Sequence, residues 1–114
     1  MHQASVIDMD RIRDAADGDE EFLRELIAVY LDDASEKMRQ LNEAIERSDS
    51  LDMGRTAHQL KGSSANMGAV GVSKIAKELE TLGRQNNVQG AKDLFRGLEA
   101  EFARVETELR QLSA

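Results

Sequence analysis

Apolar residues recur every three or four positions along most of the chain, which is the spacing of one face of an α-helix. Two of these stripes continue over several turns and predict two long amphipathic helices. The first stripe begins after Asp19, whose side chain can cap a helix start. Its members are Leu23, Ile27, Tyr30, Ala34, Met38, Leu41 and Ile45. The second stripe has nearly heptad spacing, and its members are Val88, Ala91, Phe95, Leu98, Phe102, Val105, Leu109 and Leu112.

Two shorter helices are indicated by the residues that start and stop them. Asp8 can cap a first helix that runs to about Ala16, and Gly18 can end it. The polar run Ser-Asp-Ser at residues 48–50 interrupts the first long stripe. It can cap a helix over about residues 51–67.

A turn containing Gly68 and Gly71 leads into one more predicted helix, which Gly83 or the pair Asn86-Asn87 ends. The inner face of this helix is formed by Val72, Ile75, Ala76, Leu79 and Leu82. Taken together, the stripes predict an all-α chain. We expect an antiparallel four-helix bundle, with the short additional N-terminal helix closing one end.

The composition agrees with a single helical domain over residues 1–114. With 40% hydrophobic residues the chain can form one core, and the absence of proline together with 4% aromatic residues favours helices over a β-sandwich. We expect residues 1–5 to be disordered and assign no role to His2. A start at Met1 and an end at Ala114 favour a free-standing protein.

Charge and residue usage argue against several classes of function. Without cysteine, the chain has no disulfides, no cysteine redox chemistry and no cysteine zinc site. Its net charge of −7 argues against nucleic acid or an anionic membrane as partner. No basic segment followed by an apolar run opens the chain, and no apolar stretch approaches the about 18 residues of a membrane span. We therefore expect a cytoplasmic protein.

A second apolar line lies beside the main stripe of the long helix that follows Asp19. It consists of Phe22, Leu26 and Val29, and it exceeds what one core face requires. One interpretation is that these residues receive the short first helix. The other is that part of the line reaches the surface and forms a docking patch for another protein, and both can hold at once.

A single histidine lies inside the predicted helix over residues 51–67. The small and apolar residues of this helix form one stripe, which consists of Met53, Ala57, Leu60, Ser64 and Met67. His58 lies about 140° from the centre of that stripe and should point to solvent. Lys61 and Gly62 follow at i+3 and i+4, so both share the side of the helix that carries the histidine.

These residue types suit a histidine that carries a phosphoryl group. Neutral imidazole is nucleophilic near pH 7 and forms a labile phosphoramidate, whose charge Lys61 can counter. An interior glycine costs about 1 kcal/mol against alanine, so Gly62 needs a reason such as access for the phosphate. Ser63 keeps the neighbourhood small. Ser64 falls on the inner stripe, where a hydroxyl can bond back to a helix carbonyl, and we expect it to serve packing more than chemistry.

The segment with the sequence His-Gln-Leu-Lys-Gly-Ser-Ser at residues 58–64, followed by Asn-Met-Gly-Ala at 66–69, resembles the signature of histidine-containing phosphotransfer (HPt) domains. Residues 6–8, 18–19 and 82–84 also resemble family features, so the resemblance covers almost the whole chain. It implies a phosphorelay role in bacterial two-component signalling.

The resemblance also implies individual residue roles. His58 would accept a phosphoryl group from the aspartate of a receiver domain and pass it to another response regulator. Lys61 matches the phosphate-contacting position, Gly62 the close-approach position, and Arg84 a basic residue that some members use near the phosphate. Gln59 would hydrogen-bond within the docking surface.

Glu80 is a departure, because certain family members carry a glutamine near the histidine. A carboxylate at this place would repel phosphate unless it turns away or pairs with Arg84 at i+4. Read without the resemblance, Glu78 and Glu80 are surface charges. Arg84 is then a cation that the dipole at the C-terminal end of its helix favours.

The expected partners are receiver domains and a sensor hybrid histidine kinase. No phosphate-binding loop or kinase motif is present, so we expect no kinase activity of its own and no cofactor. Mg²⁺ would come with the acidic pocket of the receiver. A closed bundle with one exposed phosphoacceptor predicts a monomer.

Two alternatives remain at this point, and a third fails. The chain could be a helical adaptor that binds receivers or kinases and never carries phosphate. The phosphoryl donor could be the ATP domain of a kinase, although the motif fits exchange with receivers better. A metal-binding or hydrolytic bundle lacks the paired Glu-x-x-His elements that it would need.

Overall fold

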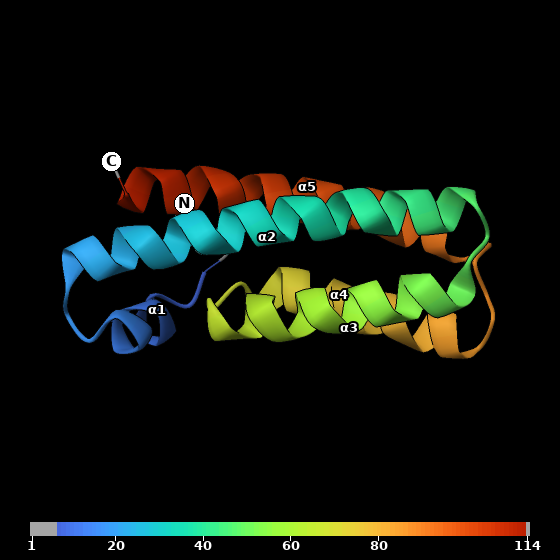
Figure 1. The fold of residues 1–114 in the computed structure, drawn as a ribbon, viewed down its shortest axis with the longest axis horizontal. Coiled ribbons are helices and arrows are strands. Elements are labelled where there is room, and N and C mark those ends of the chain that lie inside the picture. Colours follow the sequence, from blue (N-terminus) through green and yellow to red (C-terminus); the bar gives the residue numbers. More distant parts are fainter. Residues whose placement is uncertain (1–6, 114) are drawn as a thin grey trace, which may run out of the picture.

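The computed structural model describes residues 7–113, and this part of the chain forms a bundle of antiparallel helices (Figure 1). The helices are α1 (Met9–Ala16), α2 (Glu20–Glu46), α3 (Ser50–Asn66), α4 (Val70–Arg84) and α5 (Ala91–Leu112). The four long helices alternate in direction, and the short α1 lies against one end. The predicted all-α four-helix bundle with an additional N-terminal helix is confirmed. Residues 1–5, for which we expect disorder, and His2 among them, lie outside the described residues.

Three aspartates begin helices as predicted. Asp8, Asp19 and Asp49 each accept hydrogen bonds from backbone N–H groups two or three residues further on, at 3.0–3.3 Å. Each such cap stabilises its helix by about 1 kcal/mol, because it satisfies N–H groups that lack a partner inside the helix.

The long helices form a ring around the core. α2 packs against α3 and α5, and α4 packs against the same two helices, so α3 and α5 lie diagonally opposite without contact. The core is filled mostly by aliphatic side chains, and each of these contributes about 1.5–3 kcal/mol by leaving water. The largest that are fully buried are Ile12, Ile27, Leu41, Met53, Leu60, Leu79, Leu98, Leu109, Val72 and Val105.

α3 and α4 share the most extensive contact in the bundle, and glycines allow it. Gly54 on α3 faces Gly83 on α4. A Cβ atom at Gly83 would lie 2.8 Å from the Cα atom of Gly54 and 2.8 Å from the carbonyl oxygen of Ser50. Both are backbone atoms, so no side-chain movement could make room.

We therefore expect Gly83→Ala to lower the free energy of unfolding by about 2 kcal/mol, since overpacking against backbone atoms costs about 3 kcal/mol, the upper end of the usual range, and the helix gains about 1. Gly62→Ala is the matched control, because a Cβ atom there would meet nothing within 4 Å. That variant should gain up to about 1 kcal/mol. Urea unfolding followed by circular dichroism measures both, and equal effects would contradict the close contact.

Two of the residues predicted for the turns that flank the fourth helix, Gly71 and Gly83, lie inside α4 instead. The residues given with them, Gly68 before the helix and the Asn86-Asn87 pair after it, are confirmed. The chain turns at Gly68 (φ 75°) and at Asn86 (φ 54°), which adopt the left-handed conformation. A Cβ atom at Gly71 would meet the outer atoms of the flexible Glu101 side chain, which can move aside, whereas a Cβ atom at Gly83 would meet backbone. Close packing between helices therefore explains the glycine at position 83.

Other boundaries differ by a few residues. The histidine helix covers residues 50–66, one residue earlier at each end than predicted, and the last helix begins at Ala91 and not at Val88. Such shifts are ordinary at helix ends.

α1 closes the bundle end through contacts with the turn between α3 and α4. The backbone N–H of Asp8 donates to the carbonyl oxygen of Gly68 at 2.7 Å, and the Arg11 guanidinium donates to that of Ala65 at 3.2 Å. On the inner side of α1, Ile12 is buried in the hydrophobic core. None of the described helices is long and apolar enough to cross a membrane.

The second apolar line on α2 is not covered by α1. Phe22 is 43% exposed and Val29 is 68% exposed, whereas Leu26 is partly buried against the core. The interpretation that all three receive α1 is therefore wrong for Phe22 and Val29. α1 meets the start of α2 at Leu23, which shares a cavity with Ile12.

Candidate functional site

The histidine helix has the two faces that its sequence predicts. Met53, Ala57 and Leu60 are fully buried, and Met67 is buried at the C-terminal cap of α3. His58 lies on the opposite side, and 63% of its side chain is exposed. Access of a large partner to the imidazole is therefore open, which confirms the predicted orientation.

Ser64 is buried on the inner face, but its hydroxyl does not bond back to its own helix. It hydrogen-bonds to the hydroxyl of Tyr30 on α2, with the oxygens 2.7 Å apart. The hydroxyl bonds to this buried partner from another helix in place of a carbonyl of its own helix, and the burial of Ser64 agrees with the predicted packing role. Burial raises the pKa of Tyr30 to about 12, although the Ser64 bond opposes the shift. This bond ties α3 to α2 behind the histidine.

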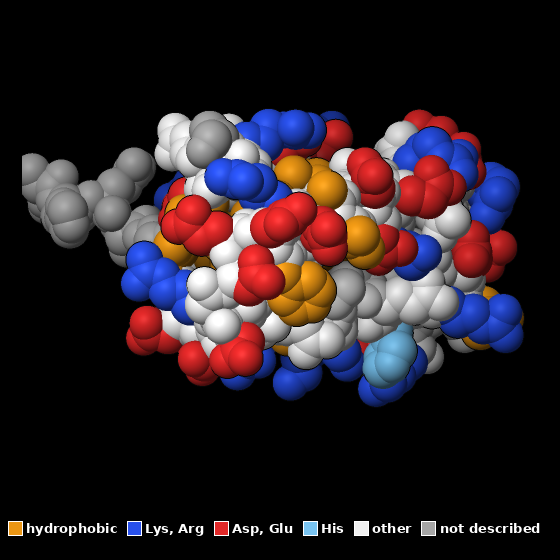
Figure 2. Space-filling view, turned by 60° about the vertical axis from the view of Figure 1, so that its left-hand side comes forward, with side chains coloured by type: hydrophobic (Ala, Val, Ile, Leu, Met, Phe, Trp, Pro, Cys, Tyr) orange, Lys and Arg blue, Asp and Glu red, His pale blue; other side chains and the backbone are white. Residues whose placement is uncertain are grey.

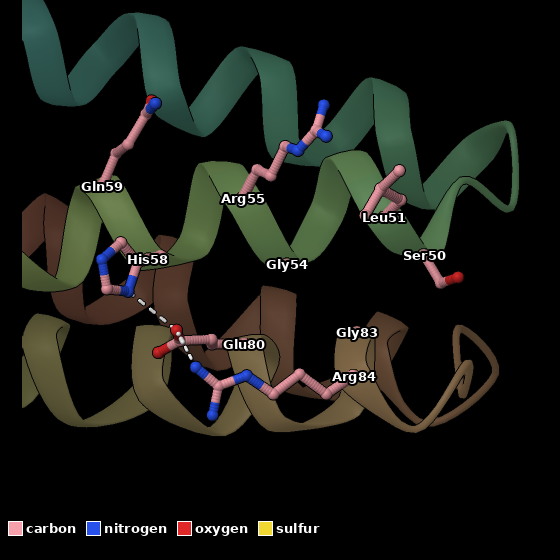
Figure 3. Close-up of a pocket in the computed structure, with 9 residues that line it drawn as sticks. All are labelled: Ser50, Leu51, Gly54, Arg55, His58, Gln59, Glu80, Gly83 and Arg84. Atoms are coloured by element: carbon pink, nitrogen blue, oxygen red, sulfur yellow. Dashed lines mark hydrogen bonds and ion pairs between the residues drawn. The ribbon is translucent and has the colours of Figure 1, made fainter.

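Glu80 is the centre of the site, and the prediction of a surface charge is wrong. It is 5% exposed, and three side chains contact its carboxylate. Lys61 donates to Oε1 at 2.8 Å, Nδ1 of His58 lies 2.7 Å from Oε2, and Arg84 donates to Oε2 at 2.9 Å. Figure 3 shows His58 and Arg84 converging on this carboxylate from α3 and α4. The alternative that Glu80 pairs with Arg84 is confirmed.

The charge of Glu80 decides which imidazole nitrogen is free. The hydrogen bond from Lys61 holds the pKa of Glu80 below its usual range, His58 and Arg84 add to this effect, and burial opposes it. An ionised carboxylate can only accept, so Nδ1 of His58 must donate its proton. In the neutral ring the lone pair then belongs to Nε2, which has no hydrogen-bond partner among the described side chains.

Glu80 should also make stability depend on pH. A carboxyl whose pKa falls on folding stabilises the folded state above its unfolded value, 4.5, and loses this contribution as the pH falls through the folded value. We expect Glu80→Gln to lower the free energy of unfolding at neutral pH, with the difference from wild type shrinking below pH 4.5.

Urea titrations at a series of pH values measure that difference. Glu78→Gln is the control, because Glu78 is exposed on the same helix. It should change stability little at any pH. A Glu80→Gln difference that persists undiminished in acid would contradict the bound carboxylate.

The remaining predicted residues surround the cluster in different ways. Gln59 is exposed beside His58, and Gly62 faces open space. Ser63 donates to the carbonyl oxygen of Leu60 at 3.3 Å, so its hydroxyl is engaged inside α3 and does not join the cluster. Arg84 lies in the last turn of α4, where the helix dipole favours a cation, and its guanidinium also donates to Glu80. Its contact with a phosphoryl group stays a prediction.

A cavity of about 450 Å³ runs beside His58 between α3 and α4 (Figure 3). The contact of Gly54 with Gly83 forms part of its lining, and Leu51 and Arg55 line it further along α3. With Glu80 ionised, the cluster that it forms with Lys61 and Arg84 carries one net positive charge, and Arg55 adds a second cation to the cavity, which suits an anion. Within residues 7–113, no group of three or more His, Asp or Glu side chains could hold a metal ion.

The spacing of small residues in the sequence indicates that Glu80 is buried, although glutamate is usually a surface residue. Glu80 lies four residues after Ala76 and three before Gly83, so it continues the line of small residues along which α4 approaches α3. A carboxylate on such a line can be buried only where cations or hydrogen-bond donors contact it. Lys61, which faces Glu80 from α3, is one such cation.

The profile of the Hpt domain family matches residues 25–113, which is most of the chain. The chain belongs to the Hpt domain family. The match covers the histidine helix, Glu80 and Arg84, whereas α1 and the first turn of α2 precede it.

Solved structures agree with this Hpt fold. Histidine-containing phosphotransfer protein B (HptB) from Pseudomonas aeruginosa PAO1 is 32% identical, with a TM-score of 0.90 over 96% of this chain and 95% of that one. The HPT domain of a sensor hybrid histidine kinase from Shewanella is 23% identical, with a TM-score of 0.79 over 94% of this chain and 92% of that one. This second likeness supports the fold alone.

Two curated relatives of this Hpt domain come from Arabidopsis thaliana. Histidine-containing phosphotransfer protein 5 is 26% identical and histidine-containing phosphotransfer protein 2 is 23% identical, each over 84% of this chain. The Hpt domain spans 63% and 64% of their respective lengths.

Proposed function

We propose that the protein is a phosphorelay intermediate that carries a phosphoryl group on His58. The group would come from the aspartate of a receiver domain and would pass to another response regulator. The observation that carries this proposal is the Nδ1–Glu80 hydrogen bond, because it leaves Nε2 of an exposed imidazole as the nucleophile. The names of the relatives, which are phosphotransfer proteins, support the same function.

The transfer step follows from these positions. Nε2 attacks the phosphorus of the aspartyl phosphate, so that a P–N bond forms and the bond from phosphorus to the carboxylate oxygen breaks. The receiver aspartate leaves as a free carboxylate. The imidazole now carries its proton on Nδ1 and a positive charge, which Glu80 offsets through the same hydrogen bond. The reverse sequence delivers the group to the second receiver.

Lys61 and Arg84 would stabilise the incoming charge. Both are bound to Glu80 in this structure, and both have flexible side chains that can turn toward a phosphoryl group on His58. Gly62 would leave room for the group one turn away, and Gln59 would hydrogen-bond to the docked partner. Ser63 would contribute only its small size.

The proposal assigns the remaining chemistry to partners. The protein would need no cofactor of its own, Mg²⁺ would be held by the receiver, and a sensor hybrid kinase would supply phosphoryl groups from ATP. We further propose that the protein acts in the cytoplasm as a monomer, because one exposed imidazole suffices for the transfer.

A two-stage label transfer tests this function. The protein is mixed with Mg²⁺ and a receiver domain charged with labelled phosphate, then isolated and offered to a second, uncharged receiver. We expect an acid-labile, alkali-stable adduct that the second receiver removes, and no label from ATP alone. A receiver that binds the protein but never labels it would overturn the relay and support the adaptor alternative.

A further inference from the structure

A second groove lies beside the phosphoacceptor site, between α1, α3 and α4. Its volume is about 340 Å³. It is lined by Arg11, Lys61, Ala65, Val70, Ser73, Lys74 and Lys77. Four of these seven residues are cations, which come from three helices, and none is acidic.

This concentration of positive charge is unusual in a chain whose net charge is −7. Within residues 7–113, Arg11, Lys74 and Lys77 form no ion pair with a carboxylate, whereas Lys37 and Arg39 of α2 pair with carboxylates of their own helix. Figure 2 shows Lys and Arg side chains gathered with the histidine along the lower edge of one face, below a region rich in Asp and Glu.

Arg11 and Lys61 have structural contacts, but folding gives no reason for Lys74 and Lys77. Lys74 and Lys77 are one turn apart on α4, where like charges repel and destabilise a helix by a few tenths of a kcal/mol. Arg11 is held beside them by its bond to the carbonyl oxygen of Ala65. A surface that keeps like charges together suits a partner of opposite charge.

Lys61 joins the groove to the phosphoacceptor site. It lines the groove and also donates to Glu80, which in turn holds His58. Ser73 fixes the spacing of the two helices here, because its hydroxyl donates to the carbonyl oxygen of Lys61 at 2.9 Å. Val70, 58% exposed, adds an apolar contact of the kind found inside interfaces.

We propose that this basic groove docks the acidic surface that surrounds the phosphorylated aspartate of the receiver partner. This inference rests on the proposed relay function and adds the surface that recognises the partner. Because the groove adjoins His58, a receiver whose aspartate reaches Nε2 must cover the neighbouring surface. Carboxylates that hold Mg²⁺ make the receiver's side of this contact acidic, so opposite charges meet across it.

Charge reversal on α4 tests the groove. The variant Lys74→Glu/Lys77→Glu is compared with Lys92→Glu/Arg96→Glu, which changes the net charge equally on α5, a helix that does not touch α3. All four side chains are exposed, and circular dichroism checks that both variants fold. The probe is a receiver domain that carries labelled phosphate. It is chosen from a panel of phosphorylated receivers as the one that labels the wild type fastest.

We expect the initial rate of label transfer at low receiver concentration to fall about tenfold for the α4 variant and less than about twofold for the α5 variant. Raising the salt from about 0.1 M to about 1 M, which shortens the Debye length from about 10 Å to about 3 Å, should slow the wild type and remove most of that gap. Equal rates for the two variants would overturn the groove as a docking surface while leaving the relay intact. If no receiver labels the wild type, the relay itself fails, and the docking proposal fails with it.

Discussion

Replacing His58 by glutamine is expected to abolish phosphoryl uptake from a phosphorylated receiver while the bundle stays folded. The amide of glutamine can still hydrogen-bond to Glu80, but it offers no nucleophilic nitrogen near neutral pH. The His58 side chain is 63% exposed, so the free energy of unfolding should change by less than about 1 kcal/mol. Label transfer and urea unfolding measure the two effects separately.

The control for this variant is Lys92→Gln, an exposed position on α5, which should take up label at the wild-type rate. Uptake by the His58→Gln protein at a comparable rate would place the phosphoacceptor elsewhere. The role assigned to His58 would then be wrong.

Gly62→Leu is expected to slow phosphoryl transfer about 100-fold without loss of stability. In a helix, a long side chain leans toward the preceding turn, so leucine at this position would crowd the imidazole of His58 at i−4. A reacting nitrogen displaced by about 1 Å costs about two orders of magnitude in rate. Because Gly62 faces open space, the substitution should not harm packing, and its higher helix propensity should stabilise the fold slightly.

Gly97→Leu provides a matched control for that experiment. Gly97 is exposed in the second turn of α5, and a Cβ atom there also meets nothing within 4 Å. Both variants should therefore gain stability similarly, whereas only Gly62→Leu should lose transfer rate. Loss of rate in both, or in neither, would contradict the close-approach role of Gly62.

The helices and their caps could be predicted from the sequence because their signals are local. The apolar stripe of α2 and the caps at Asp8, Asp19 and Asp49 depend on residues one or two turns apart. The exposure of His58 follows from the same helical geometry.

The features that the sequence did not reveal depend on contacts between helices. Gly83 has the local signature of a helix end, yet it lies inside α4 because Gly54 approaches it closely from α3. Glu80 has the residue type of a surface position, but cations from two helices make its burial possible. Local rules carry no information about which residues of two distant segments come together.

The central claim is that Glu80 holds the Nδ1 proton of His58 so that Nε2 receives the phosphoryl group. After a phosphorylated receiver has transferred its phosphoryl group to the protein, phosphorus and nitrogen NMR identifies directly the nitrogen that is bonded to phosphorus. The predicted result is a single phosphohistidine substituted at Nε2, with the Nδ1 proton still present. Phosphorylation at Nδ1, or an adduct on any residue other than His58, would contradict the claim.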